Sequence, residues 1–369
     1  MDNRGRDPAS SAKARGPAQL FRRLIGPVAV ILILLVGLFW GAVHWLNSRL
    51  DAPLAVDEGG YTLLVPRGSS FYQLGPQLVS LGLTESDLPL KLYVRFVVDA
   101  PIHAGEYRVE YGDSLRLLIE KLIEGRVVQH RLTFPEGRTV QEWLDLMAGD
   151  PVLSLQPLPS ADALRDLVAE QPGDSPEGWF FPDTYTFIRG DDGLAIFRQA
   201  HERMIDVLTA AWGQRAADLP LKNPYEALIL ASIVEKETGM PSERDRIAGV
   251  FVRRLKKGMR LQTDPTVIYG LGDRFEGNLT RQHLNEETAY NTYQIAGLPP
   301  TPIANPGREA IEAVMNPAED SALYFVARGD GSHQFSDTLA EHRRAVKDYQ
   351  LKRRDNYRSS PAPAANGER

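Results

Sequence analysis

The sequence contains a stretch of 25 residues without a formal charge, between Arg23 and Arg49. The run from Val28 to Val36 within it is unbroken and apolar. About 20 helical residues cross the hydrocarbon core of a bilayer. A cleaved signal peptide would have a shorter apolar segment, roughly 7–15 residues, and a small-x-small cleavage site after it. Since this stretch is longer and no such site follows, we predict a transmembrane helix over residues 24–48.

Charges on either side of this helix predict its orientation. Six cationic residues and two aspartates precede it, for a net charge of +4. Positive flanks stay in the cytoplasm, and tryptophans favour the membrane interface, as Trp40 and Trp45 would near the other end. Residues 1–23 are therefore predicted to form a disordered cytoplasmic tail, with the rest of the chain outside the cytoplasm. Residues 351–369 lack apolar side chains to bury and are predicted to form a second disordered tail.

The remaining composition excludes several classes of function. The whole chain carries a net charge of −6, so the part after the basic segment carries −10, which argues against binding nucleic acid. The absence of cysteine removes disulfides, thiol nucleophiles and thiolate metal sites. The seven histidines lack the paired spacing of a zinc enzyme. We therefore predict neither a cofactor nor a metal site.

A short pattern occurs three times after the apolar stretch: an apolar strand, a turn glycine, a hydroxyl residue two positions later and an amphipathic helix. The copies occupy residues 61–71, 107–115 and 132–140, with Ser70, Ser114 and Thr139 as predicted N-caps. The turn Gly112-Asp113-Ser114 resembles that of the LysM module, a small glycan-binding fold. We predict a LysM-like membrane-proximal region over residues 59–150. The alternative is that these units are packing platforms that touch no sugar.

A second region, residues 160–350, is predicted to form a mixed α+β domain, which makes the chain an α+β protein with one N-terminal transmembrane helix. Five aromatic residues fall between Glu177 and Phe187, a density that suits a core edge or a carbohydrate platform. Residues 323–335 are typical of a β-hairpin.

The segment from Tyr225 to Thr238 predicts a buried helix that ends at Gly239. Glu235 and Glu237 lie in its last turn, where carboxylates oppose the helix dipole, and such violations of local preference are expected at functional sites. Successive helical residues turn by about 100°, so these two side chains point away from each other. Glu237 continues the apolar stripe, whereas Glu235 could bond within the protein. A surface cluster making ordinary ion pairs is the alternative.

Polar segments follow this helix. A helix over residues 242–255 leads to a polar loop over 259–270, and 290–293 and 297–307 add amides, hydroxyls and phenols on stiff loops. Such groups are suited to holding sugars. The candidate substrate-binding residues are Glu235, Gln262, Thr263, Asp264, Tyr290 and Asn291.

Four motifs in this order, 231–238, 259–267, 290–293 and 297–300, resemble the endolytic murein transglycosylases of the YceG-like family. The resemblance runs from the anchor to Asp348. It implies a lyase in the periplasm, anchored in the bacterial inner membrane, with peptidoglycan glycan strands as substrate and peptidoglycan synthases as further partners. It also implies cleavage between N-acetylmuramic acid and N-acetylglucosamine inside nascent strands, leaving 1,6-anhydro ends that terminate elongation. The family's catalytic glutamate falls on Glu237.

A single acidic group is compatible with this chemistry. A carboxyl at the edge of an apolar wall stays protonated near neutral pH and can protonate a glycosidic oxygen. The sugar's own C6 hydroxyl then replaces the water or second carboxylate that a hydrolase needs. Two alternatives stay open: a glycan hydrolase that uses Asp264 with water, and a non-catalytic scaffold that binds glycan.

Overall fold

The computed structural model describes residues 17–351, so the predictions for the two tails fall largely outside the described residues. The chain divides into two compact units, the first ending at Val128 and the second beginning at Gln129. Both mix helices with short antiparallel strands, which confirms the predicted α+β class. The division falls inside the region 59–150 that the sequence grouped together, because the third strand of the repeat pairs with a strand of the second unit.

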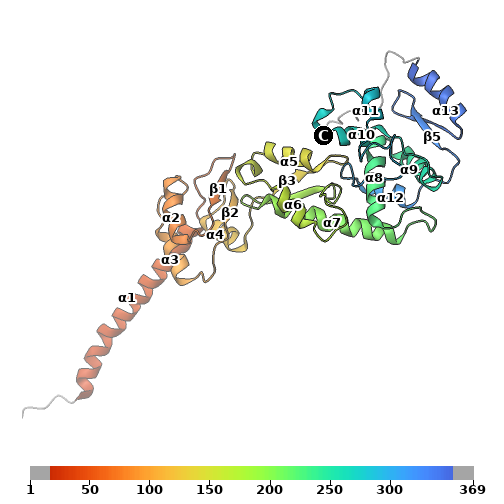
Figure 1. Ribbon diagram of the computed structural model, residues 1–369. Coiled ribbons are helices and arrows are strands. Elements are labelled where there is room, and N and C mark those ends of the chain that lie inside the picture. Colours follow the sequence, from red (N-terminus) through yellow and green to blue (C-terminus); the bar gives the residue numbers. More distant parts are fainter. Residues whose placement is uncertain (1–16, 352–369) are drawn as a thin grey trace, which may run out of the picture. The chain divides into compact units, whose positions relative to one another are not determined.

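The first unit begins with the long helix α1 (Pro17–Asp51). Its part from Gly26 to Asp51 has a mean hydropathy of 2.4 in its most apolar window, none of which is buried, and is long and apolar enough to cross a membrane. The helix continues beyond the predicted end at Ser48 because Leu50 is fully buried in the core of this unit. α1 therefore extends without a break into the folded part of the chain (Figure 1).

Two strands and three helices complete the first unit. The strands β1 (Tyr61–Val65) and β2 (Gly105–Val109) pair antiparallel, with Leu63 opposite Tyr107 in the core. The helices are α2 (Phe71–Ser80), α3 (Leu88–Phe96) and α4 (Leu115–Glu124). Apolar side chains from all of these elements form one core, which is separate from the core of the second unit.

The second unit contains two antiparallel strand pairs and a larger set of helices. β3 (His130–Thr133) pairs with β4 (Thr184–Phe187), and β5 (Tyr324–Ala327) pairs with β6 (His333–Ser336). The helices are α5 (Val140–Gly149), α6 (Ala161–Leu167), α7 (Gly193–Gly213), α8 (Pro224–Glu237), α9 (Pro241–Lys256), α10 (Asp264–Leu271), α11 (Arg281–Asn285), α12 (Arg308–Met315) and α13 (Leu339–Val346). Single turns of 3-10 helix lie at Leu153–Leu155 and Gly272–Arg274, and a π turn at Lys347–Leu351.

The structure confirms the predicted strand-turn-helix pattern in all three copies. The turn glycines Gly68, Gly112 and Gly137 have φ values of 81°, 88° and 69°, in the left-handed region that favours glycine. The hydroxyl of Ser114 accepts the Leu117 N–H at 3.3 Å, and Thr139 caps α5 in the same way. The pattern is thus a local folding unit that serves both halves of the chain.

α8 is the central helix of the second unit and packs against α7, α9, α10 and α12. Residues 227–234 are all buried, as expected of a helix that is apolar on every side. Asn223 caps its N-terminus by accepting the Glu226 N–H at 2.9 Å. α8 ends at Glu237, which places its last turn at the edge of the core.

The aromatic segment that follows Glu177 belongs to this core. Trp179, Phe180 and Phe181 are buried. Phe180 packs edge-on against Phe197 of α7, with 4.8 Å between the ring centroids. The interpretation as a core edge is confirmed, and these three rings do not form an exposed carbohydrate platform.

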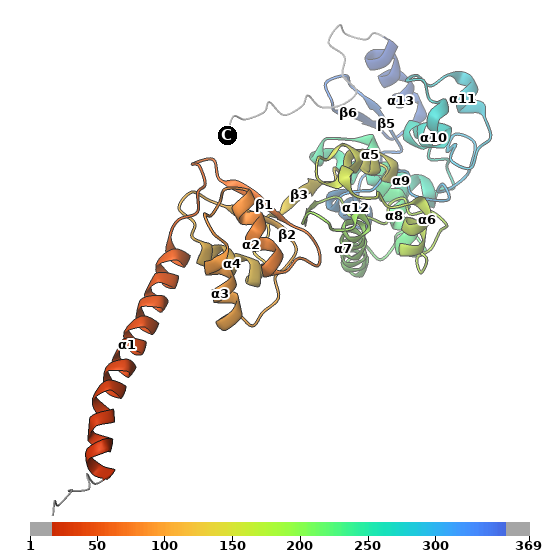
Figure 2. The ribbon, with the colours of Figure 1, turned by 90° about the vertical axis from the view of Figure 1, so that its left-hand side faces the viewer.

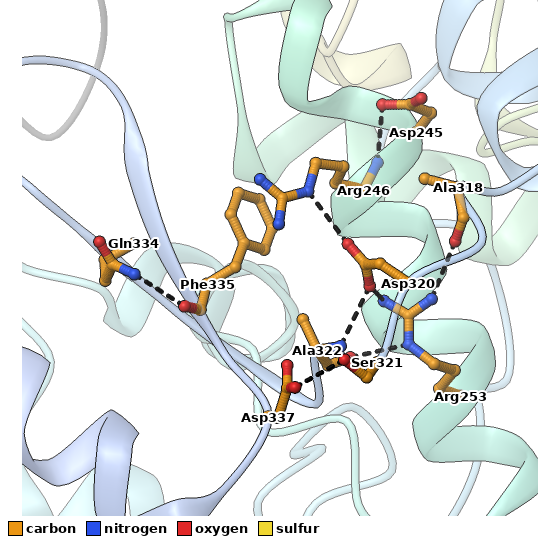
Figure 3. A network of polar contacts seen from close by, with 10 residues as sticks. All are labelled: Asp245, Arg246, Arg253, Ala318, Asp320, Ser321, Ala322, Gln334, Phe335 and Asp337. Atoms are coloured by element: carbon orange, nitrogen blue, oxygen red, sulfur yellow. Dashed lines mark hydrogen bonds and ion pairs between the residues drawn. The ribbon is translucent and has the colours of Figure 1, made fainter.

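The predicted β-hairpin is also confirmed, and a polar network joins it to α9 (Figure 3). The carboxylate of Asp320 accepts from Arg246 at 3.0 Å and from Arg253. Arg253 also donates to the carbonyl of Ala322 at 2.8 Å, just before β5. The Arg246 guanidinium lies over the ring of Phe335 in β6, 4.0 Å from its centroid. These contacts hold the hairpin against the helix that follows α8.

Candidate active site

The two carboxyl groups at the end of α8 point to different neighbours, as their spacing predicts. Glu235 is buried and accepts the backbone N–H of Gly307, the N-cap of α12, at 3.0 Å. Its other oxygen lies 3.9 Å from the guanidinium of Arg244. Burial raises the pKa of Glu235. Its carboxyl group is thus used inside the protein, where it joins α8 to the start of α12.

Glu237 is half-buried and faces the loop before α10. The hydroxyl of Thr263 donates a hydrogen bond to its Oε1. Burial raises the pKa of Glu237 to about 7, and the charge of Asp264 acts in the same direction, whereas the Thr263 hydrogen bond and the charge of Arg254 oppose it. A carboxyl group with this pKa is protonated in a large fraction of molecules at neutral pH and can act as a general acid.

Two further threonines, Thr266 and Thr292, hold Thr263, the partner of Glu237, in place. Thr263 donates its N–H to the hydroxyl of Thr292 at 3.0 Å, and its carbonyl accepts from the hydroxyl of Thr266 at 2.8 Å. The hydroxyls of Thr266 and Thr292 are 2.9 Å apart. All three side chains are buried, so the position of the Thr263 hydroxyl is set by a closed network.

Gln262 precedes this network in an unusual backbone conformation. Its φ of 51° is the one positive value at a non-glycine position among residues 17–351. Its N–H donates to the carbonyl of Thr292 at 3.1 Å, which holds the backbone in this left-handed region. Such a conformation costs roughly 1–2 kcal/mol and is concentrated at functional sites. The Gln262 side chain is exposed beside Thr263, where a ligand can reach it.

The predicted loop over residues 259–270 is wrong for its second half, because α10 begins at Asp264. Asp264-Pro265 is a strong start signal, since proline suits the first helical turn and an acidic residue there interacts favourably with the helix dipole. Asp264 is exposed and accepts the hydroxyl of Tyr293 at 2.6 Å. Burial, with this hydrogen bond, raises the pKa of Tyr293, which therefore remains a donor.

Tyr290 and Asn291 make contacts within the protein. The buried Asn291 amide donates to the carbonyls of His283, Leu284 and Glu286 at 3.1, 3.2 and 2.7 Å. The hydroxyl of Tyr290 lies 2.7 Å from that of Thr301. Both residues thus shape the loop that carries Thr292 and Tyr293 to the site.

A third buried carboxyl group, Glu177, was not among the residues predicted from the sequence. Its oxygens accept from the N–H of Val140 and the amide of Asn305, both at 3.1 Å, and from the hydroxyl of Tyr269 at 3.5 Å. Burial raises the pKa of Glu177 to about 8. Its donors belong to the start of α5, to α10 and to the loop before α12. Glu177 thus joins α10, the helix that carries Asp264, to the two other segments. The sequence signal that could have indicated Glu177 is its position as an acidic residue just before a run of apolar aromatic residues.

Comparison of the sequence with known proteins identifies a matching family. Residues 63–348 match the model of the YceG-like family. The endolytic murein transglycosylase of Bacillus subtilis (strain 168) is 28% identical over 326 residues, which cover 84% of this chain and 90% of that protein. The endolytic murein transglycosylase of Streptococcus pneumoniae serotype 2 (strain D39 / NCTC 7466) is 27% identical over 366 residues, 88% of this chain and 65% of that protein.

A crystal structure of a YceG-like protein from Listeria monocytogenes is 28% identical and covers 78% of this chain and 99% of that one, with a TM-score of 0.49. The family match includes every candidate residue around Glu237 and Glu177. Since it extends over most of the sequence, the chain belongs to the YceG-like family.

Proposed function

We propose that this protein is an endolytic lytic transglycosylase of peptidoglycan. It cleaves the bond between N-acetylmuramic acid and N-acetylglucosamine inside nascent glycan strands, leaves 1,6-anhydro-N-acetylmuramic acid ends and thereby terminates elongation. The observation that carries this proposal is the carboxyl group of Glu237, with a pKa raised to about 7, oriented by Thr263 beside exposed polar side chains. The names of the two bacterial relatives support the substrate and the reaction class.

The reaction uses Glu237 twice. Its protonated carboxyl group donates a proton to the glycosidic oxygen, and the bond from that oxygen to C1 of the muramic acid breaks with the electron pair going to oxygen. The C6 hydroxyl of the same muramic acid attacks C1, and its proton passes to the Glu237 carboxylate. The enzyme is restored and no water is consumed. Because Thr263 engages Oε1, we assign the mobile proton to Oε2.

Two exposed side chains are proposed to contact the sugars. Asp264 lies near enough for its charge to raise the pKa of Glu237, so its carboxylate can stabilise the positive charge that develops at C1. Gln262 offers an amide on a strained backbone next to Thr263. Glu235, Tyr290 and Asn291 are proposed to position the site from inside the protein, because their polar groups are bonded to neighbouring segments.

The product distinguishes this proposal from its alternatives. Purified full-length protein is incubated with uncrosslinked glycan strands, and the new ends are identified by mass spectrometry. Anhydro ends support a transglycosylase, whereas reducing ends would indicate a hydrolase using Asp264 with water. A lack of any product after long incubation, with folded protein, would favour a glycan-binding scaffold. Glu237→Gln is the inactive control.

We also propose that α1 anchors the protein in the bacterial inner membrane, with its N-terminus in the cytoplasm and the rest of the first unit and all of the second in the periplasm. The basic segment before α1 supports this orientation. In this location the newly made strands of peptidoglycan synthases would be within reach. Accessibility of a single engineered cysteine to an impermeant thiol reagent in intact cells tests the orientation, since position 72 should react from outside and position 3 should not.

Glycan binding by the LysM-like first unit is a separate proposal. The turn residue Asp113 is used internally, since it accepts from the Glu110 N–H at 2.8 Å and from Lys121 at 2.5 Å. A sugar contact would therefore fall on the exposed ring of Tyr111 beside it, which could stack on a sugar face. Weaker sedimentation of the Tyr111→Ala variant with insoluble peptidoglycan would support this role, whereas unchanged sedimentation would contradict it.

A further inference from the structure

Helix α3 of the first unit has an exposed apolar edge. Leu88, Leu92 and Phe96 follow one another at four-residue spacing on one helical face. Leu88 is 48% exposed, and Leu92 between the two ends of this face is half-buried. Phe96 is 78% exposed, and Val97 directly after it is 62% exposed. A single exposed apolar side chain is common on protein surfaces, but several together on one face mark a surface that meets another apolar phase.

α3 lies beside the outer end of the candidate membrane span. It packs against α1 in the same unit (Figures 1 and 2). Arg116 joins the two helices, since its guanidinium lies 5.2 Å from the ring centroid of Tyr93 on α3 and donates to Asp51 of α1 at 2.6 Å. Leu46 and Leu50, both within the span of Gly26–Asp51, pack in the core of this unit. The folded unit therefore begins before the apolar span ends.

The surroundings of this edge have the composition of a membrane interface. A cavity of about 530 Å³ lies between the end of α1 and the loop before α3, and its lining includes Trp45 and Arg49. Tryptophan and arginine favour the headgroup layer, where a ring or aliphatic stem is buried and the polar end stays wet. Arg95 is exposed next to Phe96. Lys91, one turn earlier, is paired with Asp87 at 2.6 Å.

We propose that the α3 edge, formed by Leu88, Leu92, Phe96 and Val97, inserts into the interfacial layer of the same bilayer that α1 crosses, with Arg95 among the lipid phosphates. This inference rests on the proposed membrane anchor. A single helix leaves the unit attached to it free to tilt with the helix, whereas a second contact beside it fixes the tilt of the first unit. The bilayer is favoured over a protein partner because α3 is packed directly against the spanning helix.

The absence of cysteine allows a direct test. The test variant of the full-length protein is Phe96→Cys. It and the single-cysteine controls are labelled with an environment-sensitive nitrobenzoxadiazole dye and reconstituted into vesicles of phosphatidylethanolamine and phosphatidylglycerol. Lipids with a quencher at a shallow or a deep acyl carbon report the depth of the dye. The matched control is Tyr72→Cys, a 52% exposed aromatic position on α2 of the same unit. Ile33→Cys, which is 70% exposed on α1, reports the span itself.

The expected result is a blue-shifted emission for the dye at position 96 and stronger quenching by the shallow lipid than by the deep one, with neither effect at position 72. A dye at 96 that emits and is quenched like the dye at 72 would overturn the inference. A dye at 96 that is blue-shifted but not quenched by either lipid would overturn it too, in favour of a protein contact. Deep quenching at position 33 is expected in all these cases, and its loss would refute the anchor instead.

Discussion

The two sides of the last turn of α8 carry the same type of residue in opposite surroundings. On one side, Glu235 accepts from the backbone of α12 and lies near the buried cation of Arg244. On the other side, Glu237 has a single side-chain hydrogen bond, from Thr263, whose sequence neighbours Gln262 and Asp264 are exposed. Position on the helix gives the direction in which each carboxyl group points, but it does not give the groups that the carboxyl group meets. Those groups come from the segment that packs against each side of α8.

The largest expected effect separates the two glutamates by activity. Glu237→Gln removes the proton donor and should lower the rate of glycan cleavage about a thousandfold or more, within the range of general acid catalysis. Glu235→Gln keeps an oxygen for the Gly307 N–H and should reduce the rate by less than about tenfold. The measurement is the initial rate of new chain ends from uncrosslinked glycan, with circular dichroism to confirm folding.

The reverse order is expected for stability. Glu235→Gln can still accept the Gly307 N–H, but it turns an amide NH2 toward the guanidinium of Arg244, so a loss of about 1–2 kcal/mol is expected although Arg244 keeps its ion pair with Glu309. Glu237→Gln should not destabilise the protein at neutral pH. A variant of Glu235 that loses activity as completely as the variant of Glu237, while folded, would erase the proposed division of roles.

The next effect tests how Glu237 is oriented. Thr263→Val removes the hydroxyl that donates to Glu237 while keeping a branched side chain of similar size. We expect cleavage to slow by roughly ten- to a hundredfold, since a misoriented general acid loses much of its contribution. The hydrogen bond from Thr263 lowers the pKa of Glu237, so its loss should also move the alkaline limb of the pH–rate profile upward. If the variant is slower but its pH–rate profile is unchanged, Thr263 contributes by packing and not by its hydrogen bond to Glu237.

A further effect concerns stability as a function of pH. The folded pKa of Glu237, about 7, lies above the value of about 4.5 in an unfolded chain, so the folded state binds the proton more tightly. The stability linked to this proton is present below about pH 4.5 and is lost as the pH rises to about 7. The melting temperature of Glu237→Gln should therefore rise relative to that of the wild type between about pH 4.5 and about pH 7. Above pH 7 the difference in melting temperature should stay constant. Thermal unfolding of both proteins over this pH range measures the difference. Melting temperatures that change in parallel with pH would contradict the prediction.

Local patterns predicted much of this fold, while contacts between distant segments were out of their reach. The helix ending at Glu237, the turn glycines and the opposite directions of Glu235 and Glu237 all follow from spacing within one element. α10 was missed because a polar run was interpreted as a loop despite Asp264-Pro265 at its start. The role of Glu177 could not be predicted, because its donors Val140, Tyr269 and Asn305 come from positions far apart in the sequence.

The smallest expected shift of the pH–rate profile concerns Asp264, the neighbour whose charge acts on Glu237. Asp264→Asn removes a negative charge that raises the pKa of Glu237, so the alkaline limb of the pH–rate profile should move downward, opposite to the shift in Thr263→Val. The asparagine can still accept the hydroxyl of Tyr293, so the loop should keep its shape. Tyr293→Phe, which removes this hydrogen bond but leaves the Asp264 charge in place, is the matched control and should not produce this downward shift. If the limb does not move in Asp264→Asn, the charge of Asp264 does not contribute to the raised pKa of Glu237, which then results from burial against the opposing Thr263 hydrogen bond and Arg254 charge.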